Sequence, residues 1–121
     1  MSSRPEELRD RTKKSALRII RLFRSLPLKT DTQVLVKQLL RSGTSVAANY
    51  RAVCRARSKA EFIARIGIVA EEADESVLWL ELLIESGVVG QEKAWELLTE
   101  AKELAAIFTA SQQTSKKGSR L

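Results

Sequence analysis

Cationic side chains recur at helical spacing near the start of the chain. Neighbours are separated by three or four residues, so an α-helix would place them along one face. The members of this first stripe are Arg11, Lys14, Arg18 and Arg21, and Arg9, Lys13 and Arg24 would widen it. Rows of cations are the electrostatic feature that binds the phosphates of a nucleic-acid backbone.

A second stripe follows, with the same repeat interrupted by Thr44 and Ala48. Its members are Lys37, Arg41, Arg51 and Arg55, and Arg57 lies just beyond them. On two neighbouring helices the stripes would form one continuous ridge, and these residues are the candidate contacts to structured RNA or DNA. The stripes contain no aromatic side chain for stacking on bases, so we expect recognition of backbone and shape.

The charge distribution supports a second interpretation. Met1 to Arg57 holds fourteen Lys and Arg against four Asp and Glu, a net of +10, whereas Ser58 to Ala110 holds four against eleven, a net of −7. The last eleven residues add three cations, so the total is 10 − 7 + 3 = +6. The cations could therefore meet acidic protein surfaces, within one subunit, between subunits or on a partner protein. The sequence leaves both interpretations open.

Residues for catalysis are scarce. The chain has no histidine, which removes the commonest general base and the commonest metal ligand. Cys54 has no base nearby, so we interpret it as a bystander. The acidic cluster Glu71, Glu72, Asp74 and Glu75 lacks a histidine and an acidic counterpart in the middle of the preceding helices. We read it as a solvated or salt-bridged face. We expect no enzyme activity, no metal and no cofactor.

Helix-forming residues dominate, with two prolines and five glycines. Apolar residues recur every three or four positions in four segments, approximately residues 5–26, 30–55, 58–86 and 91–110. Short connections force neighbouring helices to run antiparallel. The sequence therefore predicts an all-α fold, an antiparallel up-down-up-down four-helix bundle.

Local signals mark the helix ends. Pro27 should end the first helix, and Thr30 to Gln33 and Ser58 to Glu61 read as capping boxes for the second and third. Gly87 reads as a left-handed stop. Gly43 lies among small residues, which favours close packing of another helix over a kink.

Each segment has a predicted inward face. The inward residues are Leu8, Thr12, Ser15, Ile19, Leu22 and Leu26; Val34 or Leu35, Leu39, Val46, Tyr50 and Val53; Phe62, Ile66, Val69, Ala73, Val77, Leu80 and Ile84; and Ala94, Leu97, Leu98, Ala101, Leu104, Ala105 and Phe108.

The bundle should form one domain over residues 1–110, followed by a basic tail over residues 111–121 that we expect to be disordered. No uncharged apolar run reaches the roughly 18 residues of a membrane span. The first residues do not form a signal peptide, and a lone cysteine fits a reducing cytoplasm. We therefore expect a cytoplasmic protein that does not enter a membrane.

Four short motifs carry a family resemblance over about residues 16–110. They are Ser45-Val46-x-x-Asn49-Tyr50-Arg51, Arg55-x-Arg57-Ser58-x-x-Glu61-Phe62, Glu72-Ala73-x-Glu75-x-x-x-Trp79-Leu80 and Glu85-Ser86-Gly87. They resemble the bacterial, ribosomal-protein-like four-helix bundle proteins named for the intervening sequences of 23S ribosomal RNA. The accessory variability determinant of diversity-generating retroelements is similar as well.

This resemblance implies a homo-oligomer, a ring of identical subunits with a pentamer favoured, and a basic surface for nucleic acid. In the retroelement relative that surface serves a reverse transcriptase and its RNA, which gives an alternative role as an accessory subunit. By resemblance, Asn49, Arg51, Arg57 and Ser58 belong to the signature region. Ala52 departs from the pattern, because a Glu would be expected there to pair with a signature arginine.

Overall fold

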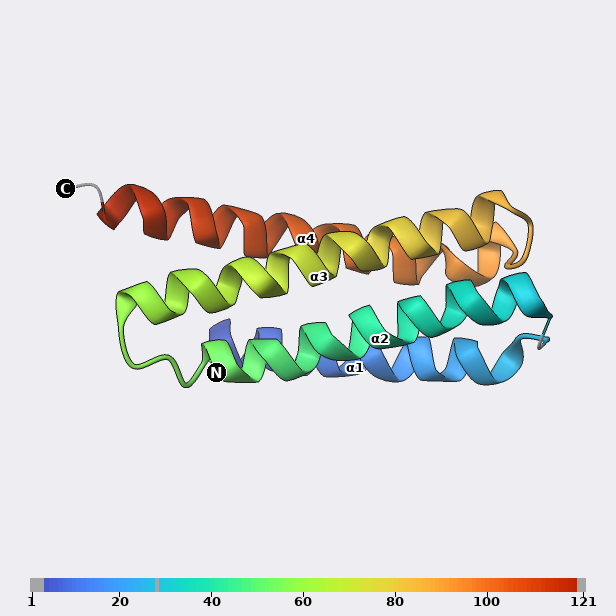
Figure 1. Cartoon of the computed structure of the whole chain (residues 1–121), viewed down its shortest axis with the longest axis horizontal. Helices are drawn as coiled ribbons and strands as arrows, with labels where there is room; N and C mark the ends of the chain where they lie inside the picture. Colours follow the sequence, from blue (N-terminus) through green and yellow to red (C-terminus); the bar gives the residue numbers. More distant parts are fainter. Residues whose placement is uncertain (1–3, 28, 120–121) are drawn as a thin grey trace.

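Residues 4–27 and 29–119 are described by a computed structural model, and they form four α-helices. These are α1 Arg4–Ser25, α2 Thr30–Val53, α3 Lys59–Glu85 and α4 Gln91–Ser119. Successive helices run in opposite directions and are joined by short connections (Figure 1). The predicted all-α antiparallel bundle is confirmed.

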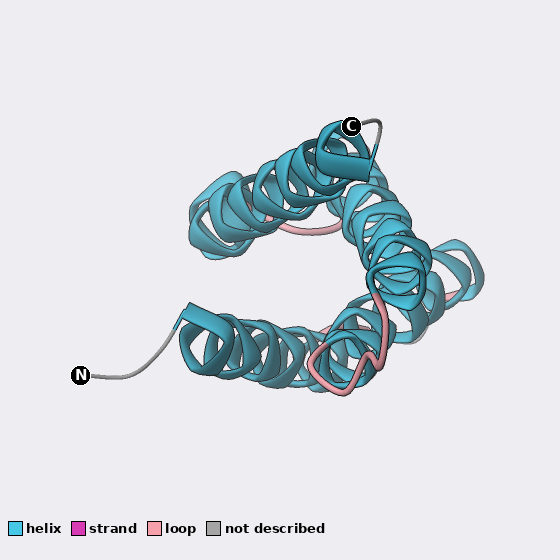
Figure 2. Cartoon of the chain, turned by 90° about the vertical axis from the view of Figure 1, so that its left-hand side faces the viewer, coloured by secondary structure: helices cyan, strands magenta, loops and turns pink. Residues whose placement is uncertain are grey.

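The four helices do not all pack equally closely against their neighbours. α2 packs extensively against α1 and α3, and α3 against α4, whereas α1 and α4 meet at far fewer positions. Viewed along the bundle (Figure 2), the helix that starts near N and the helix that ends at C flank the open side. α1 and α4 therefore approach each other less closely than the other neighbouring pairs, although apolar residues of both helices belong to the same core clusters.

The core has two apolar clusters, one towards each end of the bundle. Leu39, Leu80 and Leu83 are fully buried in the first, and Ile66 and Phe108 are almost or fully buried in the second. Most of the predicted inward residues of all four helices are buried.

Small and polar residues lie between the two clusters. The hydroxyl oxygens of Ser42 and Ser76 are 2.8 Å apart in the buried interior, joining α2 to α3. A Cβ atom at Gly43 would overlap Cδ1 of Ile19 on α1. The glycine thus permits close approach of α1 to α2, as the sequence predicts.

The helix ends match the sequence in part. The Ser58 hydroxyl accepts a hydrogen bond from the Glu61 backbone N–H at 3.0 Å, so the predicted cap of α3 is confirmed. Gly87 adopts φ +81°, the left-handed conformation predicted for it. The predicted box at Thr30 is wrong, because Thr30 is already helical and the extended N-cap residue is Lys29, which makes no side-chain cap.

The sequence leaves Val34 or Leu35 open as the first inward residue of α2, and the structure favours Leu35. Val34 is 58% exposed, whereas Val36 is 3% exposed and Leu35 is partly buried. The inner face of α2 runs from Val36 through Leu39 in steps of three and four residues, which turns Val34 to the opposite side.

The end of the last helix differs most from expectation. We expected disorder after Ala110, but α4 continues as a helix to Ser119, and residues 120–121 lie outside the described residues. Two glycines let the extension lie close to α3. A Cβ atom at Gly67 would overlap the Gln112 side chain, and one at Gly118 would lie 2.8 Å from Nζ of Lys59. Contact with α3 thus supports a segment that has little apolar periodicity of its own.

Candidate nucleic-acid interface

The first cation stripe turns towards α4. Arg11 donates to both carboxylate oxygens of Glu100, at 3.0 Å from Nε and 2.5 Å from its terminal nitrogen, and it also pairs with Glu103 at 3.1 Å. The hydrogen bond to Glu100 raises the pKa of Arg11 further above its ordinary value. Arg18 pairs with Glu96 at 3.3 Å. These two arginines bridge the thinly packed α1–α4 seam.

The middle of the second stripe turns towards α3. Arg41 pairs with Glu72 at 3.2 Å and also with Glu75. The Trp79 indole N–H donates to the same Glu75 at 3.2 Å, which helps to hold that carboxylate in place. For Arg11, Arg18 and Arg41 the structure therefore bears out the interpretation in which the cations meet the acidic helices of the same subunit.

The remaining predicted cations are distributed over the surface of α1 and α2. Lys14 pairs with Asp10 on its own helix at 2.8 Å, and this hydrogen bond raises the pKa of the Lys14 amine. Arg21 and Lys37 are exposed, and neither forms an ion pair within residues 4–27 and 29–119. The continuous ridge expected from the sequence is thus divided.

Four cations gather at one end of the α1–α2 pair. Because the helices are antiparallel, the start of α1 lies beside the end of α2, and Arg9 and Lys13 come together there with Arg51 and Arg55. They surround a hollow of about 460 Å³ that Asp10 and Cys54 also line. We call Arg9, Lys13, Arg51 and Arg55 the α1/α2 cation cluster.

Within residues 4–27 and 29–119, the cluster has no carboxylate partner. All four of its side chains are exposed, and none forms an ion pair with any residue that the structure describes. The one acidic residue of the hollow, Asp10, is engaged by Lys14. The cluster is thus a concentration of positive charge without a counter-ion in the described chain.

A second hollow extends the positive surface onto the connection between α2 and α3. It measures about 290 Å³ and shares Arg55 with the cluster, while Arg57, Arg65 and Glu61 also line it. Glu61 accepts from the Arg57 backbone N–H at 3.2 Å and from Arg65 at 2.9 Å, and these bonds lower the pKa of its carboxyl. Ala52 also lines this hollow, where a Glu would have added a carboxylate.

Sequence reasoning identified part of this site. Arg51, Arg55 and Arg57 were predicted as contacts, whereas Arg9 and Lys13 were treated only as widening the first stripe. Their i, i+4 spacing was the available signal. Arg65 was missed because it lies in the acidic half of the sequence.

Tyr50 is a buried residue whose hydroxyl is affected by one member of the cluster, Arg9. The Tyr50 ring is buried against Phe108, with 5.3 Å between ring centroids. Burial raises the pKa of Tyr50 from 10.0 to about 12; Cys54 adds to this effect, and the charges of Arg9 and Arg4 oppose it.

This shift predicts an alkaline transition. Folding stabilises the protonated phenol, so this contribution to the free energy of unfolding is complete below pH 10 and is lost as the pH rises towards about 12. Tyr50 is the only tyrosine, so the ultraviolet absorbance of phenolate reports it alone. We expect a midpoint near 12 in the folded protein and near 10 in denaturant. A folded midpoint near 10 would contradict the burial of the hydroxyl.

Metal sites and helical membrane spans are both absent from the described residues. No three His, Cys, Asp or Glu side chains are placed there to hold a metal ion. Within the same residues, no helix combines the length and the apolar character that crossing a membrane requires.

Comparisons with known proteins agree with the bundle and its motifs. A family model described as "23S rRNA-intervening sequence protein" matches residues 7–110. A crystal structure from Bacteroides thetaiotaomicron VPI-5482, described as a protein with unknown function from the S23 ribosomal protein family, superposes with a TM-score of 0.79 at 33% identity. The match covers 87% of this chain and 97% of that one. No curated protein matches. The similarity to the retroelement determinant stays a prediction. The chain belongs to the family of 23S rRNA-intervening sequence proteins.

Proposed function

We propose that this protein binds structured RNA or DNA through the α1/α2 cation cluster, with Arg57 beside it. One observation carries the proposal: four exposed cations share one hollow, and none has a carboxylate partner in the described chain. Like charges held together repel one another, so the arrangement gains free energy when an anion is bound. A phosphate backbone supplies such anions in series.

The chemistry of the cluster suits phosphate contacts. Three of its members are arginines, whose planar guanidinium groups donate two parallel hydrogen bonds to phosphate oxygens. The neighbouring hollow shares Arg55 and adds Arg57, so positive charge continues around the end of the bundle. A surface of this kind fits a backbone that passes across it better than a single small anion. The family is named for 23S rRNA intervening sequences, which makes structured RNA the first ligand to test.

A second candidate function is an oligomeric scaffold or accessory subunit. The outward face of α3 exposes Ile68, Leu78 and Leu82 by 46%, 47% and 39% of their surfaces, and Glu71 is exposed on the same helix. An apolar and acidic face of this kind is complementary to the basic surface of α1 and α2 on a second copy. By family resemblance we propose a ring, with a pentamer favoured.

The test is a fluorescence-anisotropy titration of a labelled RNA hairpin and a DNA duplex, from low to physiological salt. Each phosphate contact contributes about −0.9 to the slope of log affinity against log salt for duplex DNA. Binding through four cations therefore predicts a slope of about −3.6. The same samples are measured by light scattering.

No binding at low salt would reject the proposal and favour the scaffold. In that case the molar mass should be a multiple of 13.5 kDa that decreases as salt rises, because the cations would meet acidic subunit faces.

A further inference from the structure

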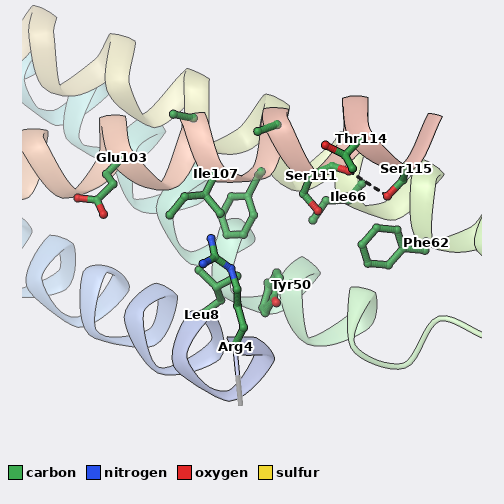
Figure 3. A pocket seen from close by; sticks show the side chains of 13 residues that line it. Arg4, Leu8, Tyr50, Phe62, Ile66, Glu103, Ile107, Ser111, Thr114 and Ser115 are labelled. Carbon is green, nitrogen blue, oxygen red and sulfur yellow. Dashed lines mark hydrogen bonds between the residues drawn. The ribbon is translucent and has the colours of Figure 1, made fainter. Parts of the chain in front are cut away.

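A larger hollow, lined by Tyr50, lies at the same end of the bundle as the cation cluster. It measures about 560 Å³ and opens between the start of α1 and the second half of α4. Tyr50 and Phe108 line it from the core, and Leu8, Phe62 and Ile107 supply further apolar surface (Figure 3). Its volume is in the range of pockets that bind small molecules.

Polar groups line the same hollow. Ser111 and Thr114 contribute hydroxyls from the part of α4 that was expected to be disordered. Arg4 contributes an exposed guanidinium, and it forms no ion pair with the residues that the structure describes. Glu103 is also at the hollow, where Arg11 engages it at 3.1 Å. The hollow thus combines an apolar wall, neutral hydrogen-bonding groups and a cation, Arg4, without an ion pair among the described residues.

This combination selects among ligands. The flat apolar face of an aromatic base can stack on the half-buried Phe62 ring. The polar edges of the base can hydrogen-bond to the hydroxyls of Ser111 and Thr114. A phosphate on the same ligand would meet Arg4. A simple alkyl carboxylate would use the apolar wall and the arginine but would make no hydrogen bond to the hydroxyls.

The position of the hollow connects it to the cation cluster. Tyr50 lines the hollow, and Arg51, the next residue of α2, lines the hollow of the cluster. Arg4 of this hollow and Arg9 of the cluster both belong to the start of α1, so the two hollows lie at the same end of the bundle. A strand that follows the cluster can therefore leave its last, unpaired nucleotide in the hollow.

We propose that the hollow lined by Phe62 and Arg4 binds one nucleotide, either free or as the unpaired end of a bound nucleic acid. In its second form the inference rests on the proposed function. The binding of a free nucleotide does not depend on the proposed function.

The experiment compares one RNA duplex with blunt ends and the same duplex with a short single-stranded overhang. Stacking one base on an aromatic side chain predicts about tenfold tighter binding of the overhang, the fold-change that corresponds to about 1.4 kcal/mol. Phe62→Leu should remove most of this gain and leave the blunt duplex unchanged. Arg4→Gln should reduce the gain as well.

Phe23→Leu is the matched control, because Phe23 is also half-buried but packs on the other core cluster. It should leave the gain intact. In a parallel arm, the four free ribonucleoside monophosphates are titrated by equilibrium dialysis, with decanoate as competitor. Free-nucleotide binding that Phe62→Leu abolishes, and that decanoate does not displace, supports the inference.

The outcomes separate the two proposals. Binding of the blunt duplex with no gain from the overhang and no binding of nucleotides overturns this inference and leaves the proposed function standing. Nucleotide binding without duplex binding supports the hollow and rejects the proposed function. Decanoate that binds as tightly as the nucleotides overturns the inference in favour of an apolar acid.

Discussion

Replacing Arg9, Lys13, Arg51 and Arg55 together with Gln is expected to remove most of the salt-dependent nucleic-acid binding. The four cations surround one hollow and have no carboxylate partners among the described residues, so their loss breaks no ion pair seen within the chain. The slope of log affinity against log salt for duplex DNA should become shallower by about 3.6, from about 0.9 for each lost phosphate contact. Anisotropy titrations across salt concentrations measure it directly.

A matched control uses the same number of cations elsewhere on α1, on α2 and in the connection between them. Arg21, Arg24, Lys29 and Lys37 are exposed, and none forms an ion pair within the described residues. Converting them to Gln also lowers the formal net charge by 4, from +6 to +2. This variant should retain most of the binding. Equal losses in both variants would mean that the overall field of the protein, and not the cluster, attracts nucleic acid.

The helices and their inner faces could be predicted from the sequence because apolar periodicity is a local property. Leu8, Ile19 and Leu22 in α1, and Ala94, Leu97 and Phe108 in α4, are buried as predicted. The choice between Val34 and Leu35 stays open in the sequence because both lie at the start of α2, where few apolar residues precede them to fix the register.

The candidate site was harder to predict, because it depends on how each helix is turned towards its neighbours. Arg11 and Arg9 are two residues apart, and a helix places them about 200° apart around its axis. Arg11 turns towards Glu100 on α4, whereas Arg9 lies with Arg51 at the end of α2. The sequence shows that acidic helices exist, but it does not show which cations they will neutralise.

The hollow beside Tyr50 depends even more on tertiary packing. It brings together Arg4, Phe62 and Thr114, which come from three different helices. Thr114 belongs to a polar segment whose helix is supported by contact with α3, as Gly67 and Gly118 show. No spacing rule joins residues so far apart in the chain. Phe62 also brings an aromatic ring to the cationic end of the bundle, although the cation stripes themselves contain none.

Phe108→Ala is expected to produce the largest loss of stability, about 3–5 kcal/mol in the free energy of unfolding. The Phe108 ring is fully buried and packs against Tyr50, with Ile66 in the same core cluster. Removing it also leaves a cavity next to the hollow that Tyr50 and Phe108 line. The free energy of unfolding of a typical domain is only about 5–15 kcal/mol, so the expected loss is a large fraction of the total stability. Denaturant unfolding at fixed protein concentration measures the change, because any self-association would alter the apparent stability.

Two further measurements show whether the loss arises from this core cluster. Trp95→Ala removes a larger aromatic side chain that is 54% exposed, and we expect it to change stability by no more than about 0.5 kcal/mol. Phe108→Ala should also lower the pKa of Tyr50 from about 12 towards 10, because water would reach the phenol once its neighbour is gone. A Tyr50 midpoint that stays near 12, together with a small loss of stability, would mean that neighbouring side chains have collapsed into the space. The hollow should then shrink as well, and in that variant the affinity for overhangs should fall while the affinity for blunt duplexes stays constant.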